Sequence, residues 1–313
     1  MDLSVSEFLT FSKCRYLWDY KYNMRLVPNQ PNKHLWLGTG IHYALAEHYR
    51  NRGVSVARAW NTYTEHFPLS TTDILEYTDL GRTMAEHYGV WSPVHDQYTE
   101  VLAIEKPFHL LLDSGLRFTG VIDAIWRVPN QGVWLIEHKT HAQMPAIEEL
   151  QFAPQGVAYM LAAVTDTDLK KYQAKGVMYN ILRKAAPSPP VILKDGSVSK
   201  AKNVHCSPEY YRSFVHKQGY DAAPYEDFIA SMPKDDYFWR PQIVFSKKRI
   251  TGFVSQLFNM REAIAREGFY QPDPRQLCAY CDYRSLCELR LWGAEFAPLA
   301  ESEYHKAAPH GDE

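Results

Sequence analysis

Three apolar stretches in the middle of the chain restrict its possible folds more than any other feature. They run in order as "YTEVLAIEKPFHLLLD" (98–113), "GLRFTGVIDAIWRV" (115–128) and "GVWLIEHKT" (132–140). Val, Ile, Leu and aromatic residues at this density favour β-strands, and the turn-forming residues between the stretches favour tight connections. We therefore predict a three-stranded antiparallel meander.

Helical patterns surround this meander. Before it we predict helices over 6–24, 34–51, 54–66 and 73–91, the first with a Ser4-x-x-Glu7 capping box. After it we predict a helix over 146–164, a strand over 176–182, an exposed loop over 185–203, broken helix over 207–232, a short strand over 237–245 and a long helix over 246–267. Helices before a mixed sheet, with a helix crossing between strands, indicate an α/β core with helical insertions.

The chain is long enough, at 313 residues, to bury a sizeable core. We predict a single domain over 1–313 and divide it into five segments. These are a helical N-terminal part (1–95), an αβ core that carries the chemistry (96–182), a segment with the loop, the strand and the long helix (183–267), a cysteine cluster (268–290) and a tail (291–313).

Apolar runs and net charge exclude two classes of protein. No apolar run reaches the roughly 18 residues of a membrane span, and the first 26 residues mix charged and aromatic side chains, unlike a signal peptide. We therefore expect a cytoplasmic protein with no membrane partner. A formal net charge of −2 excludes a polybasic DNA-coating protein, so a polyanion would have to bind a local patch, such as Lys247 to Arg249, or a bound metal.

The third apolar stretch ends in charged residues. Glu137 and Lys139 are two positions apart, so a strand points both side chains to one face. Asp123 ends the "GVID" run of the preceding strand, and a hairpin could place it beside Glu137. Two adjacent carboxylates repel each other unless a cation lies between them, and Mg²⁺ or Mn²⁺ prefers oxygen ligands. Lys139 could then orient a water molecule or stabilise charge on a phosphate.

Each of these residues also has a structural interpretation. Glu137 and Lys139 could form a solvated ion pair of little energetic value. His42, on a helical face with Leu45, could be a core histidine, and Gln155 and Tyr159 could be a polar and an aromatic residue at a helix–sheet contact. Glu105 in the first stretch could be a supporting acid or a surface charge. The apolar run before Glu137 favours a buried strand, in which charges need a function.

The segment "LCAYCDYRSLC" (277–287) holds three of the five cysteines as C-x2-C-x5-C. In a reducing compartment such clusters bind metal or catalyse reactions more often than they form disulfides. A tetrahedral metal or an iron–sulfur cluster needs four ligands, so one ligand is missing from this segment. Zinc, an iron–sulfur cluster and plain burial all remain open at this point. Cys206 stands alone and is expected to be a free thiol.

The order of these motifs resembles the PD-(D/E)XK nuclease superfamily, and within it the RecB-like branch. "GVID" is followed after 13 residues by "EHK" and then by "QGVAY", with a histidine on an upstream helix in "GTGIHYALAEHY". The residues that match the motifs of the branch are His42, Asp123, Glu137, Lys139, Gln155 and Tyr159. The resemblance implies a restriction-endonuclease-like fold, with a mixed β-sheet core flanked by helices and a helical N-terminal insertion.

The resemblance also implies a role for each matching residue. His42, Asp123, Glu137 and the backbone carbonyl of His138 would hold Mg²⁺ or Mn²⁺, so the His138 side chain should be replaceable. Lys139 would position the attacking water. By the same resemblance, Gln155 and Tyr159 would line the DNA path beside the metals.

A subset of these nucleases, including AddB-type and CRISPR-associated RecB-like members, binds a [4Fe–4S] cluster through one early cysteine and a late C-x2-C-x5-C. Cys14 fits the early position, so the resemblance implies a cluster held by Cys14, Cys278, Cys281 and Cys287. Such an iron–sulfur clasp would join the two termini and close a loop of about 260 residues, which restricts the unfolded chain strongly. Zinc bound by the same ligands remains the alternative.

From these observations we expect a metal-dependent DNA exonuclease that acts on single-stranded or free DNA ends and contains a structural [4Fe–4S] cluster. Two alternatives remain: a structure-specific endonuclease of the same fold, and a non-enzymatic iron–sulfur protein that binds DNA in recombination. The complete set of His, Asp, Glu and Lys argues against the second, because a binding protein has no use for buried acids. Protein partners are left unknown by the sequence.

Overall fold

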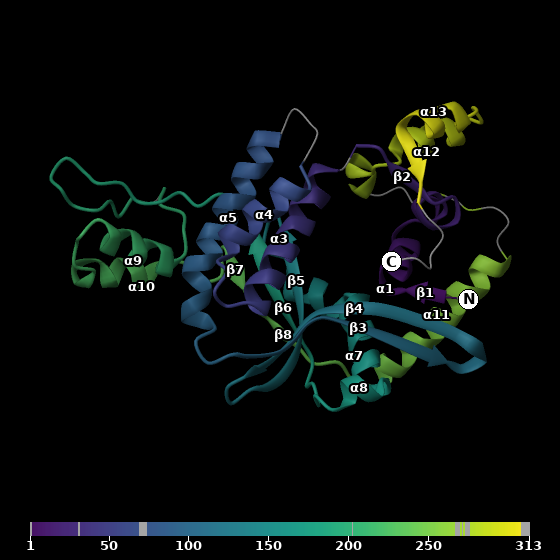
Figure 1. Cartoon of the computed structure of the whole chain (residues 1–313), viewed down its shortest axis with the longest axis horizontal. Helices are drawn as coiled ribbons and strands as arrows, with labels where there is room; N and C mark the ends of the chain where they lie inside the picture. The colour runs from purple at the N-terminus through teal and green to yellow at the C-terminus, as the bar shows by residue number, and fades with distance from the viewer. Residues whose placement is uncertain are drawn as a thin grey trace.

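The computed structural model describes residues 2–30, 32–68, 74–201, 203–266, 270, 272 and 276–307. The N-terminal third is mostly helical (Figure 1). Its elements are β1 (Asp2–Ser4), α1 (Val5–Lys13), α2 (Arg15–Trp18), the π-helical turn η1 (Asp19–Asn23), β2 (Leu26–Pro28), α3 (Lys33–Arg50), α4 (Val56–His66) and α5 (Ile74–His95).

The strands of the sheet and their helices occupy the middle of the chain. They are β3 (Glu100–Leu112), the 3₁₀ turn η2 (Asp113–Gly115), β4 (Leu116–Val128), β5 (Gly132–His141), α6 (Ile147–Phe152), α7 (Pro154–Thr165), α8 (Thr167–Lys170) and β6 (Val177–Arg183). The rest comprises α9 (Pro208–Lys217), η3 (Ala223–Tyr225), α10 (Glu226–Ser231), β7 (Phe238–Trp239), β8 (Gln242–Ile243), α11 (Lys247–Arg266), η4 (Gln276–Tyr280), α12 (Arg284–Leu291), α13 (Ala297–Glu303) and β9 (Tyr304–Lys306).

The main sheet is mixed, and helices flank it. β3, β4 and β5 pair in antiparallel order, which confirms the predicted meander. β6 then pairs parallel to β5 after the crossing helices α6 to α8, and the short β7 and β8 pair antiparallel to β6. Within the described residues the sheet has seven strands, because β1 also pairs parallel to β4. The α/β class is therefore correct.

β4 holds the arrangement together, because three strands pair with it. β3 runs along one edge of β4 for almost its whole length. The other edge is shared: β1 pairs with 117–119, and β5 pairs with 124–128. Neither strand pairs with residues 120–123, so β1 and β5 diverge there. We call this opening, where Asp123 leaves β4, the fork.

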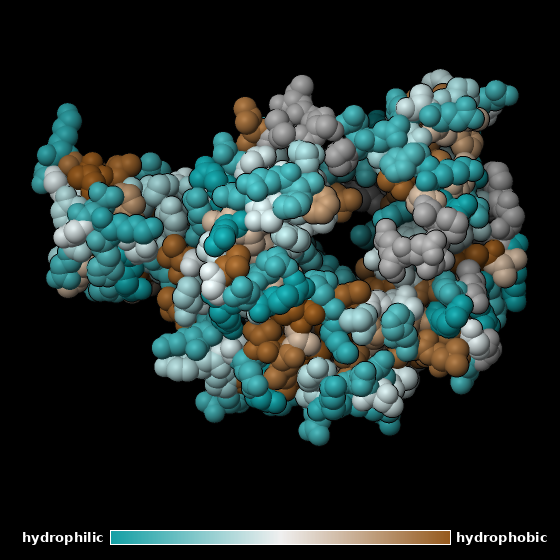
Figure 2. Space-filling view, in the orientation of Figure 1, coloured by the Kyte–Doolittle hydropathy of each residue, from teal (hydrophilic) through white to brown (hydrophobic). Residues whose placement is uncertain are grey.

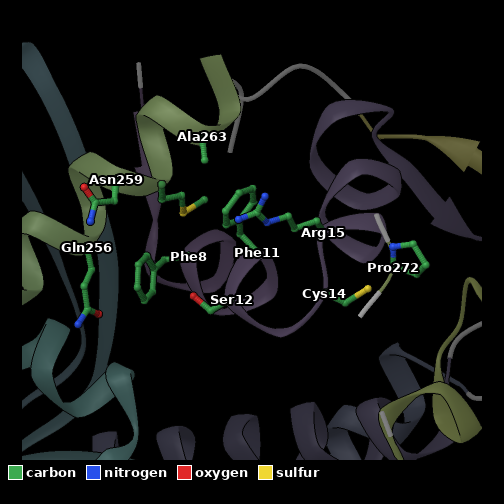
Figure 3. Close-up of a pocket in the computed structure, with 10 residues that line it drawn as sticks. Phe8, Phe11, Ser12, Cys14, Arg15, Gln256, Asn259, Ala263 and Pro272 are labelled. Carbon is green, nitrogen blue, oxygen red and sulfur yellow. The ribbon is translucent and has the colours of Figure 1, made fainter. Parts of the chain in front are cut away.

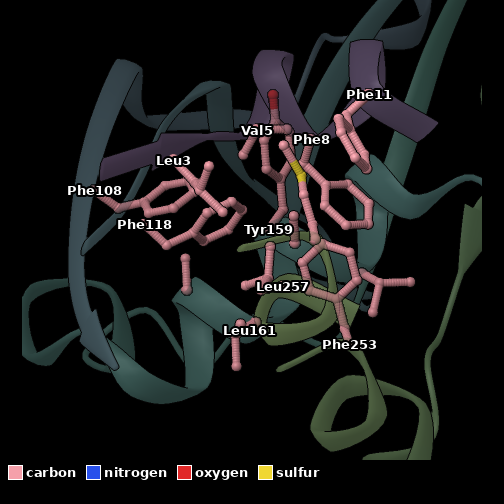
Figure 4. Close-up of a cluster of buried hydrophobic side chains, with 14 of the residues drawn as sticks. Leu3, Val5, Phe8, Phe11, Phe108, Phe118, Tyr159, Leu161, Phe253 and Leu257 are labelled. Atoms are coloured by element: carbon pink, nitrogen blue, oxygen red, sulfur yellow. The ribbon is translucent and has the colours of Figure 1, made fainter. Parts of the chain in front are cut away.

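Two hydrophobic clusters cover the two faces of the sheet. On one face, α1, α7 and α11 pack over the strands, and Figure 4 shows Phe8, Phe118 and Phe253 close to Tyr159. Ring centroids of Phe8 and Phe253 lie 4.8 Å apart. On the other face, α3, α4 and α5 pack over Trp126 and its neighbours. β5 is therefore buried on both sides, as its apolar run predicted.

Three predicted elements are interrupted in the structure. The helix predicted over 6–24 breaks at Cys14, which has an extended backbone (φ −163°, ψ 126°) and lets Trp18 pack on Phe11. The helix predicted over 146–164 breaks before Pro154, because a residue that precedes proline avoids the helical conformation. The strand predicted over 237–245 is split at Arg240 and Pro241, since proline has no N–H for the ladder.

The segment between β6 and β7 forms a small lobe that projects from the body (Figures 1 and 2). Its own cluster includes Tyr211, Val215 and Ile229. The loop predicted over 185–203 is not plain loop, because Ile192 and Val198 form an antiparallel bridge. The predicted end of the long helix at 267 and the start of the cysteine segment at 268–269 lie outside the described residues.

The C-terminal part returns to the N-terminal part. β9, which lies in the segment named the tail, pairs antiparallel with β2. The Tyr283 hydroxyl donates to the Leu26 carbonyl at 2.6 Å, and the Arg290 guanidinium donates to Asp19 at 2.6 Å. The two ends of the chain are therefore packed together. Among the described residues, no helix combines the length and apolar character needed to cross a bilayer.

Candidate active site

The fork places the two predicted acids next to each other. Pairing between β4 and β5 stops at Ala124 and Ile136. Asp123 precedes Ala124 on β4, and Glu137 follows Ile136 on β5. Both side chains are buried. The Asp123 carboxylate replaces the missing ladder bond, since Oδ2 accepts from the His138 backbone nitrogen at 2.7 Å. The local fold thus fixes Asp123 against the main chain of β5.

Glu137 and Lys139 face α7 and form a connected group with it. The Lys139 ammonium forms an ion pair with Glu137 Oε1. Gln155, in the first turn of α7, donates to Glu137 Oε2 at 2.9 Å and to the Tyr159 hydroxyl at 3.1 Å. Lys139 Nζ in turn donates to Gln155 Oε1 at 2.7 Å. The structure therefore brings all four predicted residues into one hydrogen-bonded set.

His42 reaches the same acids from α3. Its Nδ1 lies 3.4 Å from Asp123 Oδ2, and its side chain is 32% exposed. Burial lowers the pKa of His42, and Lys139 lowers it further. The charge on Glu137 and a hydrogen bond to the His138 backbone oppose this decrease. An imidazole that stays neutral can donate a lone pair to a metal. His42 therefore lies beside Asp123, and its role as a metal ligand stays a prediction.

The electrostatics of the fork favour a cation. Burial raises the pKa of Asp123 well above its usual range, the charge on Glu137 raises it further, and the His138 N–H opposes both. A proton or a cation must therefore accompany the two carboxylates. Two carboxylates with a neutral imidazole form a donor set that suits Mg²⁺ or Mn²⁺, so the residues present fit such an ion.

Glu105 is a third acid near the fork. It lies on β3 between Ile104 and Lys106, which pair with Ala124 and Ile122 on either side of Asp123. Its backbone is left-handed (φ 47°), which is uncommon for a residue other than glycine. Burial raises the pKa of Glu105, Arg50 opposes this, and Glu137 adds to it. Glu105 is close enough to sense the acids, which favours the supporting role over a plain surface charge.

The side chains are not arranged as a finished metal cage. Within the described residues, no three or more His, Cys, Asp or Glu side chains lie close enough together to hold a metal ion. The Glu137 carboxylate instead forms an ion pair with Lys139 and accepts a hydrogen bond from Gln155. A cavity of about 410 Å³ borders Asp123 and is lined by this residue, Gln155 and Tyr159 together with residues of β1, α1, β3 and β4.

Four of the five cysteines, all of them described residues, line another cavity, of about 450 Å³, although no three of them lie close enough together to hold a metal ion. Cys14 comes from the break between α1 and α2, and Cys278, Cys281 and Cys287 come from the C-terminal segment. Burial and the three other cysteines raise the pKa of Cys287 to about 11, and Arg290 opposes them. Cys206 is buried in the projecting lobe, away from this group. We call the four-cysteine group the cysteine cavity.

Cys14 also borders a second cavity, of about 610 Å³, between α1 and α11 (Figure 3). Phe8, Phe11 and Ser12 of α1 line it together with Gln256 and Asn259 of α11. Helix α1 therefore separates the cysteine cavity from the helices that pack beside the fork.

No sequence pattern indicated the side chains that contact His138 on the face of the sheet opposite α7. Asn180 on β6 donates to His138 Nδ1 at 2.9 Å, and Arg240 donates to Asn180. Both residues are distant from the motifs in the chain. The one available signal is register: Asn180 is a polar residue within the apolar strand "GVMYNIL" that follows α8.

Comparison with known proteins identifies the family of the chain. A model of the PD-(D/E)XK nuclease superfamily matches residues 2–288. No curated protein matches the chain significantly. Among solved structures, the crystal structure of SSO0001 is similar, with 12% sequence identity and a TM-score of 0.29 over 90% of this chain and 95% of that chain. So low a TM-score carries no argument. The family match covers nearly the whole chain, and the protein therefore belongs to the PD-(D/E)XK nuclease superfamily.

Proposed function

We propose that the protein is a metal-dependent exonuclease that hydrolyses DNA from single-stranded ends. One observation carries the proposal: the fork joins buried Asp123 and Glu137 and sets Lys139 in contact with Glu137. Buried like charges raise the free energy of the metal-free protein, so their presence calls for a ligand that offsets them.

The residues have distinct parts in the proposed reaction. Asp123, Glu137, His42 and the His138 carbonyl would hold Mg²⁺ or Mn²⁺. Such an ion lowers the pKa of a bound water and neutralises charge on the phosphate. Lys139 would hold the attacking water by a hydrogen bond, since its ammonium already lies among the acids. Gln155 would keep Lys139 in place, because it accepts from Nζ at 2.7 Å.

Several features support a nucleic-acid strand as substrate. Burial lowers the pKa of His141 at the end of β5, Lys139 and Lys184 lower it further, and Glu149 opposes them, so two lysines and one acid act on this residue. The face in Figure 2 is hollowed between the helices α3 to α5 and the part that carries α12 and α13. A hollow with local positive charge suits a flexible strand end better than a rigid duplex.

We further propose that the cysteine cavity holds a [4Fe–4S] cluster with a structural role. Four cysteines line one cavity, and thiolates are the ligands of such clusters. Cys14 follows α1, and α1 packs against α7, which carries Gln155 and Tyr159. A cluster bound there would hold α1 in place and thereby support the helix beside the acids. Zinc on the same cysteines is the competing assignment.

The test is a cleavage assay on anaerobically purified protein. We expect end-labelled linear single-stranded DNA to be shortened from its end with Mg²⁺ or Mn²⁺, and circular single-stranded DNA to resist. Glu137→Gln, which keeps the size and hydrogen-bonding capacity of the side chain, is the control and should be inactive. Cutting of the circle would show an endonuclease, and no cleavage of any substrate with either metal would refute the proposed function.

A further inference from the structure

A buried hydrogen-bond network lies behind the fork, on the face of the sheet that α3 and α5 cover. It runs from Arg240, between β7 and β8, through Asn180 on β6 to His138 on β5. Asn180 is 0% exposed, His138 is 2% exposed, and the Arg240 side chain is 14% exposed. By the family resemblance the His138 side chain has no task, so its burial within a polar network requires another explanation.

The network fixes the orientation of the Asn180 amide. Arg240 Nε can only donate, so the Asn180 atom that lies 2.9 Å from it must be the oxygen Oδ1. The Asn180 nitrogen therefore faces His138 Nδ1 at 2.9 Å and the Tyr88 hydroxyl at 3.0 Å. Because Nδ1 of His138 accepts this hydrogen bond, the proton of the neutral ring resides on Nε2.

Arg240 is itself held on several sides. Its guanidinium forms a two-pronged ion pair with buried Asp96, in which Nη2 lies 3.2 Å from Oδ2. Nη2 also donates to the Tyr88 hydroxyl at 2.8 Å. The guanidinium lies over Trp91 at 4.6 Å and over Trp126 at 4.9 Å. A buried guanidinium with this many partners is rigid and can fix whatever it contacts.

The same network reaches the helix that carries His42. Tyr49 lies two turns along α3 from His42, and its hydroxyl donates to Asp96 at 2.7 Å. The Tyr49 ring is also nearly parallel to the His138 ring, with centroids 6.1 Å apart. One set of buried groups thus fixes both the rotation of α3 and the position of residue 138 on β5.

We propose that Arg240, Asn180 and His138 form a positioning system for the metal site, an inference that rests on the proposed nuclease function. The system holds the main chain of His138, whose N–H aligns Asp123 and whose carbonyl would contact the ion. The His138 side chain is then a positioning residue and not freely replaceable. Hydrogen-bond partners of metal ligands typically change affinity or activity about 10- to 100-fold when they are removed.

The decisive pair of variants is His138→Leu and His138→Asn. Leucine fills much of the space but offers no acceptor to Asn180. The asparagine oxygen stands at the same branch of the side chain as Nδ1 and can accept this hydrogen bond. We expect His138→Leu to raise the Kd for Mn²⁺ about tenfold, measured by electron paramagnetic resonance of free Mn²⁺. His138→Asn should stay within about threefold of the wild type.

Cleavage kinetics add a second readout. In His138→Leu the Mn²⁺ concentration for half-maximal cleavage should rise with the Kd, while the rate at saturating Mn²⁺ falls less. Tyr88→Phe is the matched control, because it removes a buried hydroxyl of the network and leaves the contact between Asn180 and His138 intact. It should lower the melting temperature without raising the Kd for Mn²⁺.

The outcomes separate this inference from the proposed function. If the wild type binds Mn²⁺ and cuts DNA but His138→Leu binds Mn²⁺ as tightly, the positioning role is wrong and the nuclease assignment stands. Equal weakening in His138→Leu, His138→Asn and Tyr88→Phe also overturns the positioning role, since it shows a general packing effect. A wild type that neither binds Mn²⁺ nor cleaves DNA overturns both.

Discussion

The fork and the cysteine cavity each bring like groups together, but they surround them differently. At the fork, Asp123 accepts from the His138 main chain, and Glu137 accepts from Lys139 and Gln155. These partners belong to the protein and stay in place without a metal. The fork should therefore keep its geometry when divalent ions are removed, and chelation should stop cleavage reversibly.

The cysteine cavity surrounds its four thiols largely with aromatic and aliphatic side chains, including Tyr16, Tyr20 and Leu291. With the pKa of Cys287 raised to about 11, this thiol is protonated at neutral pH unless a metal replaces the proton. The cavity thus depends on a bound group to an extent that the fork does not. If both proposed sites bind metal, we expect separate consequences of metal loss: loss of cleavage at the fork and loss of folding stability at the cysteine cavity.

The largest expected effect tests the chemical half of this comparison. Glu137→Ala and Lys139→Ala should each lower the cleavage rate about a thousandfold or more, because each removes a group from the charged set. Glu137→Ala also removes a like charge beside Asp123, so the folded state should not lose stability. The measurements are single-turnover cleavage and thermal unfolding.

The control for these variants is Glu148→Ala, an exposed acid on α6. It should cleave DNA at the wild-type rate. Turnover near the wild-type level in Glu137→Ala or Lys139→Ala would show that the fork is not the place of the reaction.

The next effect tests whether the cysteine cavity needs a bound group for the stability of the fold. Cys14→Ala should lose the bound iron and lower the melting temperature by about 10 °C, because the proposed cluster would no longer link Cys14 to the C-terminal cysteines. Cys14 is distant in the chain from the segment 278–287. Loss of iron in Cys14→Ala would therefore indicate that Cys14 and this segment bind the same cluster. Iron content and thermal unfolding of anaerobically prepared protein are the measurements.

Cys206→Ala is the matched control, since it removes the one cysteine outside the cysteine cavity. It should keep all of its iron and lose only the small stability of a buried thiol, about 1 kcal/mol. Stoichiometric zinc without iron in the wild type would show that the cysteines bind zinc and not an iron–sulfur cluster. Full iron retention in Cys14→Ala would remove Cys14 from the ligand set.

A smaller effect separates the two interpretations of His42, as a metal ligand or as a core histidine. If His42 binds the ion, His42→Ala should raise the Mn²⁺ concentration needed for half-maximal cleavage about tenfold and change the melting temperature little, because the side chain is 32% exposed. His48→Ala on the same helix, which loses a hydrogen bond to the Val54 carbonyl, is the control for helix stability. A large loss of stability with an unchanged Mn²⁺ requirement would assign His42 to the core.

Much of the fork was predictable because its residues are close in the chain. Asp123, Glu137 and Lys139 lie on neighbouring strands, and Gln155 and Tyr159 lie on the next helix but one. Local period and turn chemistry predicted the adjacent strands of Asp123, Glu137 and Lys139, whereas the family resemblance added Gln155 and Tyr159 to the site. The opening itself was not predictable, because it depends on β1. Three residues at the start of the chain pair with β4 far along the sequence, and no local pattern signals that contact.

The network behind the fork was missed for the same physical reason. Arg240 binds Asp96, which is 144 residues away, and Asn180, which is 60 residues away. Such partners meet only after the sheet and α5 have packed. His42 is an intermediate case: its helix was predicted from pattern, but its contact with Asp123 followed from the family resemblance alone.

The smallest expected effect uses a third buried region as a reference, one that has neither a carboxylate pair nor a group of thiols. At the joint between α5 and the projecting lobe, His87 is 1% exposed, and its Nε2 accepts from the Ser207 backbone nitrogen at 3.0 Å. Burial lowers the pKa of His87 to about 3, and Glu209 opposes this only in part. His87 is therefore neutral in the folded protein at every pH at which the chain is expected to work.

The sign of the resulting pH dependence follows from this depressed pKa. Between about pH 6.5 and 3 the unfolded chain binds a proton at His87 and the folded protein does not, so stability falls as the pH falls through that window. From pH 7.5 to 5.5 the loss should be on the order of 1 kcal/mol. His87→Gln, which can still accept from Ser207, should show a correspondingly smaller loss in thermal unfolding over the same range. Because the His87 ring packs on Tyr210, Tyr237 and Phe238 and not on the acids of the fork or on the cysteines, adding Mn²⁺ should not change this difference. An equal pH dependence in the wild type and His87→Gln would show that His87 is protonated in the folded protein.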